Sequence, residues 1–94
     1  MHICVAANLE KRPDFQKILD ALGTVYEDDP RPYDIALFGD ACCSKIQVRL
    51  DTGTTAGELT ANVSSRESQT TEQVVSAIRS SIEQMLDELE TIAG

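Results

Sequence analysis

The spacing of apolar residues follows three different patterns along this chain of 94 residues, and the order of these patterns constrains the fold more than any other feature. Residues 2–7 and 33–39 are short, nearly continuous apolar runs, which are typical of buried strands. Residues 45–51 and 58–64 alternate apolar with polar residues, which indicates antiparallel strands with one face in water. Residues 13–22 and 71–92 repeat apolar residues at intervals of three and four, which predicts two amphipathic helices.

The first helix is expected to begin at Pro13, since proline suits a first helical turn. We expect it to end before Gly23, a residue that favours the position after a helix. Val25 and Tyr26 leave room for a brief edge strand, and the prolines and acids of residues 27–32 predict a loop.

The last helix has a capping box at its start, with Thr70 as N-cap and Gln73 three residues later. Ser64 with Glu67 is a second candidate start. The glycines of residues 52–57 suit a hairpin between the two alternating strands. The main apolar stripe of the helix is flanked by Val74 and Leu86 and comprises Val75, Ile78, Ile82, Met85, Leu89 and Ile92.

These elements predict one α+β domain over residues 1–94, a two-layer sandwich of order β-α-β-β-β-α. A right-handed crossover makes the first two strands parallel, and the later strands form an antiparallel meander. The sheet is therefore expected to be mostly antiparallel, with two helices on one face.

The net charge of the chain argues against several classes of function. Sixteen acids and eight bases give a net charge of −8. Binding to nucleic acid depends largely on Lys and Arg, so direct binding to nucleic acid or to an anionic membrane is not expected. The longest apolar run is too short to cross a membrane, and residues 1–7 do not resemble a signal peptide. Three cysteines, two of them adjacent, indicate reduced thiols and a cytoplasmic protein.

The sequence contains no phosphate-loop, dinucleotide or metalloprotease motif, and its one histidine is His2. Catalysis needs rigidly supported groups, and chain termini fray, so the chain is not expected to be an enzyme.

Two interpretations of the cysteines are open. His2, Cys4, Cys42 and Cys43 are the residue types of a zinc site, but a parallel crossover separates His2 from Cys43. We therefore favour Cys4 as a small core residue and Cys42-Cys43 as part of a turn, with no metal and no cofactor.

The loop Asn8–Arg12 is the alternative binding site, for a small ligand. Lys11 and Arg12 precede a helix, a position that attracts anions, and Gly39-Asp40 is expected nearby. An ordinary solvated loop explains the same residues.

Acidic residues are the leading candidates for a function. Acids near a helix C-terminus oppose the helix dipole, and Glu83 and Asp87 repel each other at a spacing of four. A helix that keeps them is expected to meet a basic partner, such as a nucleic-acid-handling enzyme. The expected function is an inhibitor or adaptor, with phage-type DNA mimics that act as anti-CRISPR or anti-restriction proteins as one such class. The predicted partner-binding residues are Asp28, Asp29, Glu83, Asp87, Glu88 and Glu90.

A homodimer is also predicted. A helix over residues 71–92 is about 33 Å long, at ~1.5 Å per residue. Strands of five to seven residues reach only ~17–23 Å. The end of the helix is therefore expected to pass beyond the sheet and to pair with a second copy through Met85, Leu86, Leu89 and Ile92.

Overall fold

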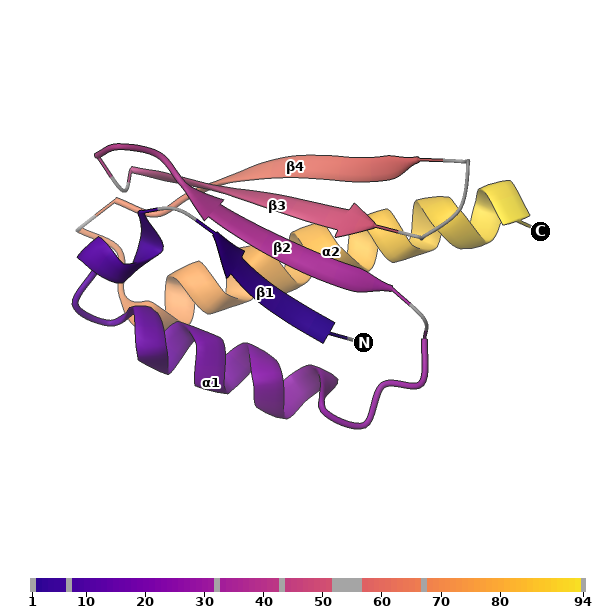
Figure 1. The fold of residues 1–94 in the computed structure, drawn as a ribbon, viewed down its shortest axis with the longest axis horizontal. Coiled ribbons are helices and arrows are strands. Elements are labelled where there is room, and N and C mark those ends of the chain that lie inside the picture. Colours follow the sequence, from indigo (N-terminus) through magenta and orange to yellow (C-terminus); the bar gives the residue numbers. More distant parts are fainter. Residues whose placement is uncertain are drawn as a thin grey trace.

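The computed structural model describes residues 2–6, 8–31, 33–42, 44–51, 57–66 and 68–93. Along the chain, a first strand, a 3₁₀ turn and a helix are followed by three strands and a long helix (Figure 1). Their bounds are β1 (His2–Ala6), η1 (Leu9–Lys11), α1 (Phe15–Tyr26), β2 (Asp34–Gly39), β3 (Lys45–Asp51), β4 (Glu58–Ser64) and α2 (Thr71–Ala93). Part of the predicted hairpin loop, Cys43, Glu67 and the side chain of Ile92 lie outside this description.

The four strands form one sheet in the order β1-β2-β3-β4. β1 runs parallel to β2, while β2–β3 and β3–β4 are antiparallel. Both helices cover the same face of this sheet (Figure 1). The predicted α+β class and element order are confirmed, and the sheet is mixed because the α1 crossover returns β2 in the direction of β1.

The core lies between the sheet and the helices. Ile35 and Leu37 of β2 and Ile46, Val48 and Leu50 of β3 are fully buried. α2 buries Val74, Ile78, Ile82, Met85 and Leu86 against them. The predicted stripe was displaced: Val74 and Leu86 are buried and Val75 and Leu89 are only half-buried, because an α-helix repeats every 3.6 residues and its i+4 row faces the sheet.

α1 differs from the predicted helix at both ends. It begins at Phe15 and runs through Gly23 to Tyr26, so the expected helix end at Gly23 and the brief strand at residues 25–26 were both wrong. Tyr26 is 3% exposed and continues the buried row of Ile18 and Leu22 at intervals of four. Burial of this large side chain stabilises the extra turn more than the glycine weakens it.

Among the described residues, neither α1 nor α2 covers the other face of the sheet. Cys4 is exposed, so its prediction as a core residue was wrong. Ala36 and Phe38 on the same face of β2 are half-buried, with the Phe38 ring 4.4 Å from the Arg49 guanidinium carbon. β1 and β2 were therefore not buried on both faces as expected, because both helices gather on one side.

Candidate functional site

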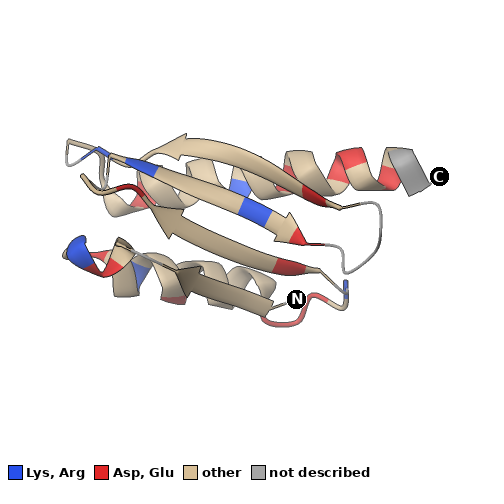
Figure 2. Cartoon of the chain, turned by 45° about the horizontal axis from the view of Figure 1, so that its top comes forward, with Lys and Arg blue, Asp and Glu red and all other residues tan. Residues whose placement is uncertain are grey.

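The fold collects acidic residues at one end of the molecule, where α1 and α2 finish, β1, β2 and β4 begin, and β3 finishes (Figure 2). We call this the acidic end. It holds ten acids and three bases, which are Arg31, Arg49 near the end of β3 and Arg79 one turn before Glu83 on α2, so its net charge is −7 in a chain whose total is −8. The acids are Glu27, Asp28, Asp29, Asp34, Asp51, Glu58, Glu83, Asp87, Glu88 and Glu90.

The opposite end of the molecule is nearly neutral. It carries five bases, which are Lys11, Arg12, Lys17, Lys45 and Arg66, and the four described acids Glu10, Asp14, Asp40 and Glu72. The protein is therefore strongly polarised along its length, which is a tertiary property. A positively charged partner is therefore attracted to the acidic end far more strongly than to the opposite end.

Three acids of the acidic end lie side by side across the sheet, and the sequence analysis missed them. The strand register places Asp34 beside Asp51 and Asp51 beside Glu58, and all three are exposed. Like charges directly opposite on neighbouring strands destabilise a sheet. They are 24 residues apart at most in the chain, and only the register of β2, β3 and β4 brings them into one row.

The acids predicted on α2 lie at this end. Asp87, Glu88 and Glu90 are exposed on the last turns of the helix. Glu83 is 55% exposed, accepts a hydrogen bond of 3.1 Å from the Tyr26 hydroxyl, and lies 4.0 Å from Arg31. Burial raises the pKa of Tyr26 to about 12, with the Glu83 carboxylate as the second cause.

The two aspartates in the loop after α1 differ in how far their charges are available to a partner. Asp28 is exposed, but Asp29 binds the Arg31 guanidinium through both carboxylate oxygens and accepts the Arg31 backbone N–H at 3.0 Å. These hydrogen bonds lower the pKa of Asp29 to about 2. Asp29 is thus a charge compensated within the chain, and Asp28 is the residue of this pair that faces outward.

Of the residues predicted for a dimer, the three whose side chains the structure describes, Met85, Leu86 and Leu89, do not form an exposed surface. Met85 is 5% exposed and Leu86 is 1% exposed, both within the core of a single chain. Leu89 is half-buried and packs against that core. The end of α2 does project past the strands (Figure 1), yet Leu86 is buried in the core of the single chain.

At the opposite end, the loop Asn8–Arg12 meets two other loops around an open hollow of about 830 Å³. Asn8, at φ 67°, donates its side-chain amide to the carbonyl of Gly39 at 3.3 Å, so the predicted approach of these two segments is confirmed. The hollow is lined by residues 11–14, 41–42 and 69–71, which include Lys11 and Cys42.

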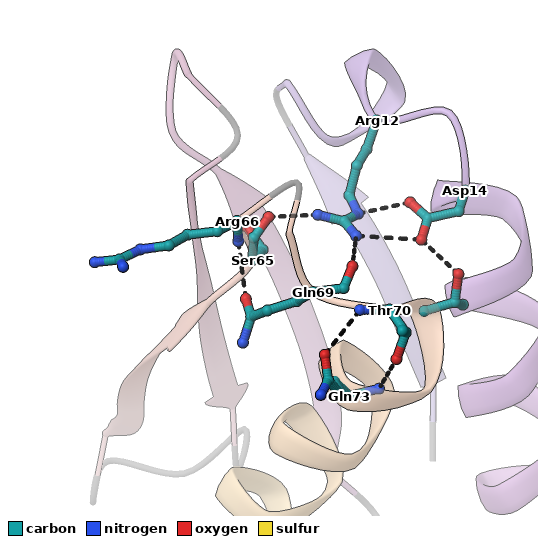
Figure 3. Close-up of polar contacts among 8 residues, drawn as sticks. Arg12, Asp14, Ser65, Arg66, Gln69, Thr70 and Gln73 are labelled. Carbon is teal, nitrogen blue, oxygen red and sulfur yellow. Dashed lines mark hydrogen bonds and ion pairs between the residues drawn. The ribbon is translucent and has the colours of Figure 1, made fainter.

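Arg12 lines this hollow and connects several segments of the chain through hydrogen bonds (Figure 3). It is 6% exposed, donates to the Asp14 carboxylate at 2.6 and 3.2 Å, and also donates to the carbonyl oxygens of Ser65 and Gln69. Asp14 accepts a further hydrogen bond from Thr71 at 2.6 Å. The Arg12 hydrogen bond is the main reason that the pKa of Asp14 is lowered. The arginine therefore fastens the start of α1 to the start of α2.

The N-terminus of α2 is satisfied by its own residues, as the capping box predicted. Gln73 N–H donates to the Thr70 hydroxyl at 3.2 Å, and Thr70 N–H donates to the Gln73 side chain at 2.9 Å. Asp40 is likewise bound by groups of its own turn. Its carboxylate accepts hydrogen bonds from the backbone N–H and the hydroxyl of Ser44, both at 2.7 Å. The hydrogen bond from the hydroxyl is the main reason that the pKa of Asp40 is lowered.

Neither a metal centre nor a membrane span emerges from the described residues. No group of three or more His, Cys, Asp and Glu side chains among them is arranged to hold a metal ion. Cys4 lies in the middle of β1 and Cys42 lies beyond the end of β2. Within the same residues, no helix has the length and apolarity that a membrane crossing requires.

Comparison of the chain with models of protein families, with curated proteins and with solved structures gives no match.

Proposed function

We propose that this chain is a non-enzymatic interaction protein whose acidic end docks on a basic surface of another protein. The concentration of the net charge at one end carries the proposal. Acids needed only for solubility serve equally well when they are spread over the surface. Here α2, the row across the sheet and the loop after α1 all place acids at the same end, and two of these placements oppose local stability.

Such an end would act first on the rate of association. A concentrated charge steers an oppositely charged partner over distances of about 10 Å at ~0.1 M salt, and more salt screens the attraction. Basic surfaces of this kind are common in enzymes that handle nucleic acid, because those enzymes bind phosphates. We therefore favour an inhibitor or adaptor that competes with nucleic acid for the basic surface of such an enzyme.

The test compares two charge-reversed variants with the wild type in affinity capture from the source cells. One variant carries Asp87→Lys, Glu88→Lys and Glu90→Lys at the acidic end. The matched control carries Glu10→Lys, Asp20→Lys and Glu72→Lys, which changes the net charge equally at exposed residues elsewhere. The acidic-end variant is expected to lose the partner that the control keeps.

Salt and DNA provide the second part of the test. A partner retained at low salt is expected to leave at ~0.5 M salt and to be displaced by double-stranded DNA. Equal retention of the partner by both variants would contradict the proposal. If the partner leaves at high salt but DNA does not displace it, the proposal of a basic partner stands and the proposal of competition with nucleic acid fails.

The hollow beside Lys11 supports a second candidate, the binding of a small anionic ligand. Its volume is within the range of small-molecule sites, ~300–1,000 Å³. We rank it second because Arg12 and the capping box are engaged with the protein's own groups. A rise in melting temperature with inorganic phosphate or a nucleotide, lost in Lys11→Ala, would favour it over the first candidate.

A further inference from the structure

β1 is an edge strand whose surface differs from that of the other edge, β4. In the sheet as described, β1 has β2 as its neighbour and nothing on its other side. Val5 is 37% exposed and Ile3 is half-buried, although both point to the helix side. β1 carries no proline, lysine or acid, which are the residues that protect edge strands from pairing. β4 begins with exposed Glu58 and is covered by α2.

An apolar groove of about 280 Å³ runs between β1 and α1. It is lined by Ile3, Val5, Leu19, Gly23, Tyr26 and Glu27. Gly23 lies inside α1, where glycine is about 1 kcal/mol less favourable than alanine. A Cβ atom at Gly23 would meet nothing within 4 Å, so the fold of the single chain does not require glycine there. Glycine keeps the surface of α1 low beside the edge, which allows another backbone to approach closely.

The backbone of β1 fixes which groups the edge offers. His2 N–H donates to the carbonyl of Tyr33 at 3.3 Å, on the β2 side. Because successive residues of a strand point their N–H and C=O groups to opposite sides, those of Ile3 and Val5 point to the open edge. An added antiparallel strand would form hydrogen-bonded pairs with these two residues and would leave Cys4 in a non-hydrogen-bonded pair.

From these features we propose that the partner of this edge is a second copy of the chain, paired antiparallel through β1 about a two-fold axis at Cys4. Ile3 then pairs with the partner's Val5, and the two grooves meet under a continuous sheet. The pairing reverses one copy relative to the other, so each acidic end lies beside the nearly neutral end of the partner, which carries Lys11 and Lys17. A parallel arrangement would instead bring two acidic ends together, each of net charge −7.

The proposed pair does not require that the acidic end docks on another protein. It uses β1 as the dimer surface in place of the α2 surface predicted from the sequence. Its most direct signature is the distance between the two Cys4 residues. Residues in a non-hydrogen-bonded antiparallel pair have Cα atoms ~4.5 Å apart, which is within the ~4.4–6.8 Å range of disulfides. Cys4 and the partner's Cys4 are therefore expected to cross-link on mild oxidation.

The first experiment oxidises two single-cysteine variants with diamide, which accepts the two protons and two electrons released by each pair of thiols. Cys42→Ser with Cys43→Ser leaves Cys4, and Cys4→Ser with Cys43→Ser leaves Cys42, which is also exposed, as the control. The Cys4 variant is expected to form a covalent dimer at least about tenfold faster than the control. Equal rates would overturn the proposed pairing.

The second experiment measures mass by sedimentation equilibrium. The wild type is expected to change from 10.3 kDa to twice that mass as its concentration rises. Val5→Pro removes the N–H that faces the open edge and leaves the β1–β2 bonds intact, so it is expected to remain monomeric. Val5→Thr keeps the N–H and the shape and is expected to dimerise. A wild type that stays at 10.3 kDa up to about 1 mM would rule out the second copy and leave an extended peptide as the occupant of the edge.

Discussion

Replacing Arg12 by methionine is expected to lower the free energy of unfolding by about 3 kcal/mol. Methionine retains much of the apolar stem but removes the guanidinium that binds Asp14, Ser65 and Gln69. Removing one partner of a buried ion pair lowers stability by ~3–5 kcal/mol, because the other charge is left without compensation. The side chain of Asp14 is 20% exposed and keeps its bond from Thr71, which places the loss at the lower end of this range.

A double-mutant cycle tests the reasoning behind this number. Urea unfolding is compared for the wild type, Arg12→Met, Asp14→Asn and the double variant. If the stranded carboxylate causes most of the loss, the double variant is expected to lose ~1–2 kcal/mol less than the sum of the single variants. Arg12→Lys serves as the control for charge alone, since lysine cannot form the forked pair with a carboxylate.

The result that refutes the reasoning is a loss below about 0.5 kcal/mol in Arg12→Met, which is the level of an ordinary surface substitution. Strict additivity in the cycle would also refute it, because the arginine and the carboxylate would then act separately.

Four further predictions concern single positions. The unfolding free energy is expected to fall as pH decreases from 3.8 to about 2, because a carboxyl with a lowered folded-state pKa, such as Asp29, stabilises the fold only while it is ionised; pH-dependent urea unfolding measures this. Tyr26 has a raised pKa, so its contribution is complete below pH 10 and is lost as pH rises towards about 12; its ultraviolet titration is expected to be missing from Tyr26→Phe. Gly23→Ala is expected to raise stability by up to ~1 kcal/mol, and a decrease in melting temperature would show that Gly23 has a role within the single chain. Leu86→Ala is expected to lower the free energy of unfolding by ~2–5 kcal/mol and to leave the oligomeric state the same as that of the wild type. Dissociation of an oligomer without loss of stability would instead show that Leu86 lies in an interface.

The acidic end shows where sequence reasoning about the site reached its limit. The acids of α2 were found from their spacing because Asp87, Glu88 and Glu90 are neighbours on one helix. Asp34, Asp51 and Glu58 each stand alone in the sequence at the end of a strand, where a single charge is unremarkable. Their row exists only in the strand register, and so does the concentration of charge that supports the proposed function.

Local patterns determined the elements and their order. The change from continuous to alternating apolar residues separated β2 from β3, and Thr70 with Gln73 located the start of α2, since both signals depend on residues within four positions of each other. Long-range burial decided the rest. Tyr26 carried α1 through Gly23 because its ring enters the core, and Cys4 became exposed because both helices cover the other face of the sheet. Only the tertiary structure could place Arg12 against Ser65, 53 residues away, because a buried charge takes its partner from whatever segment the fold brings beside it.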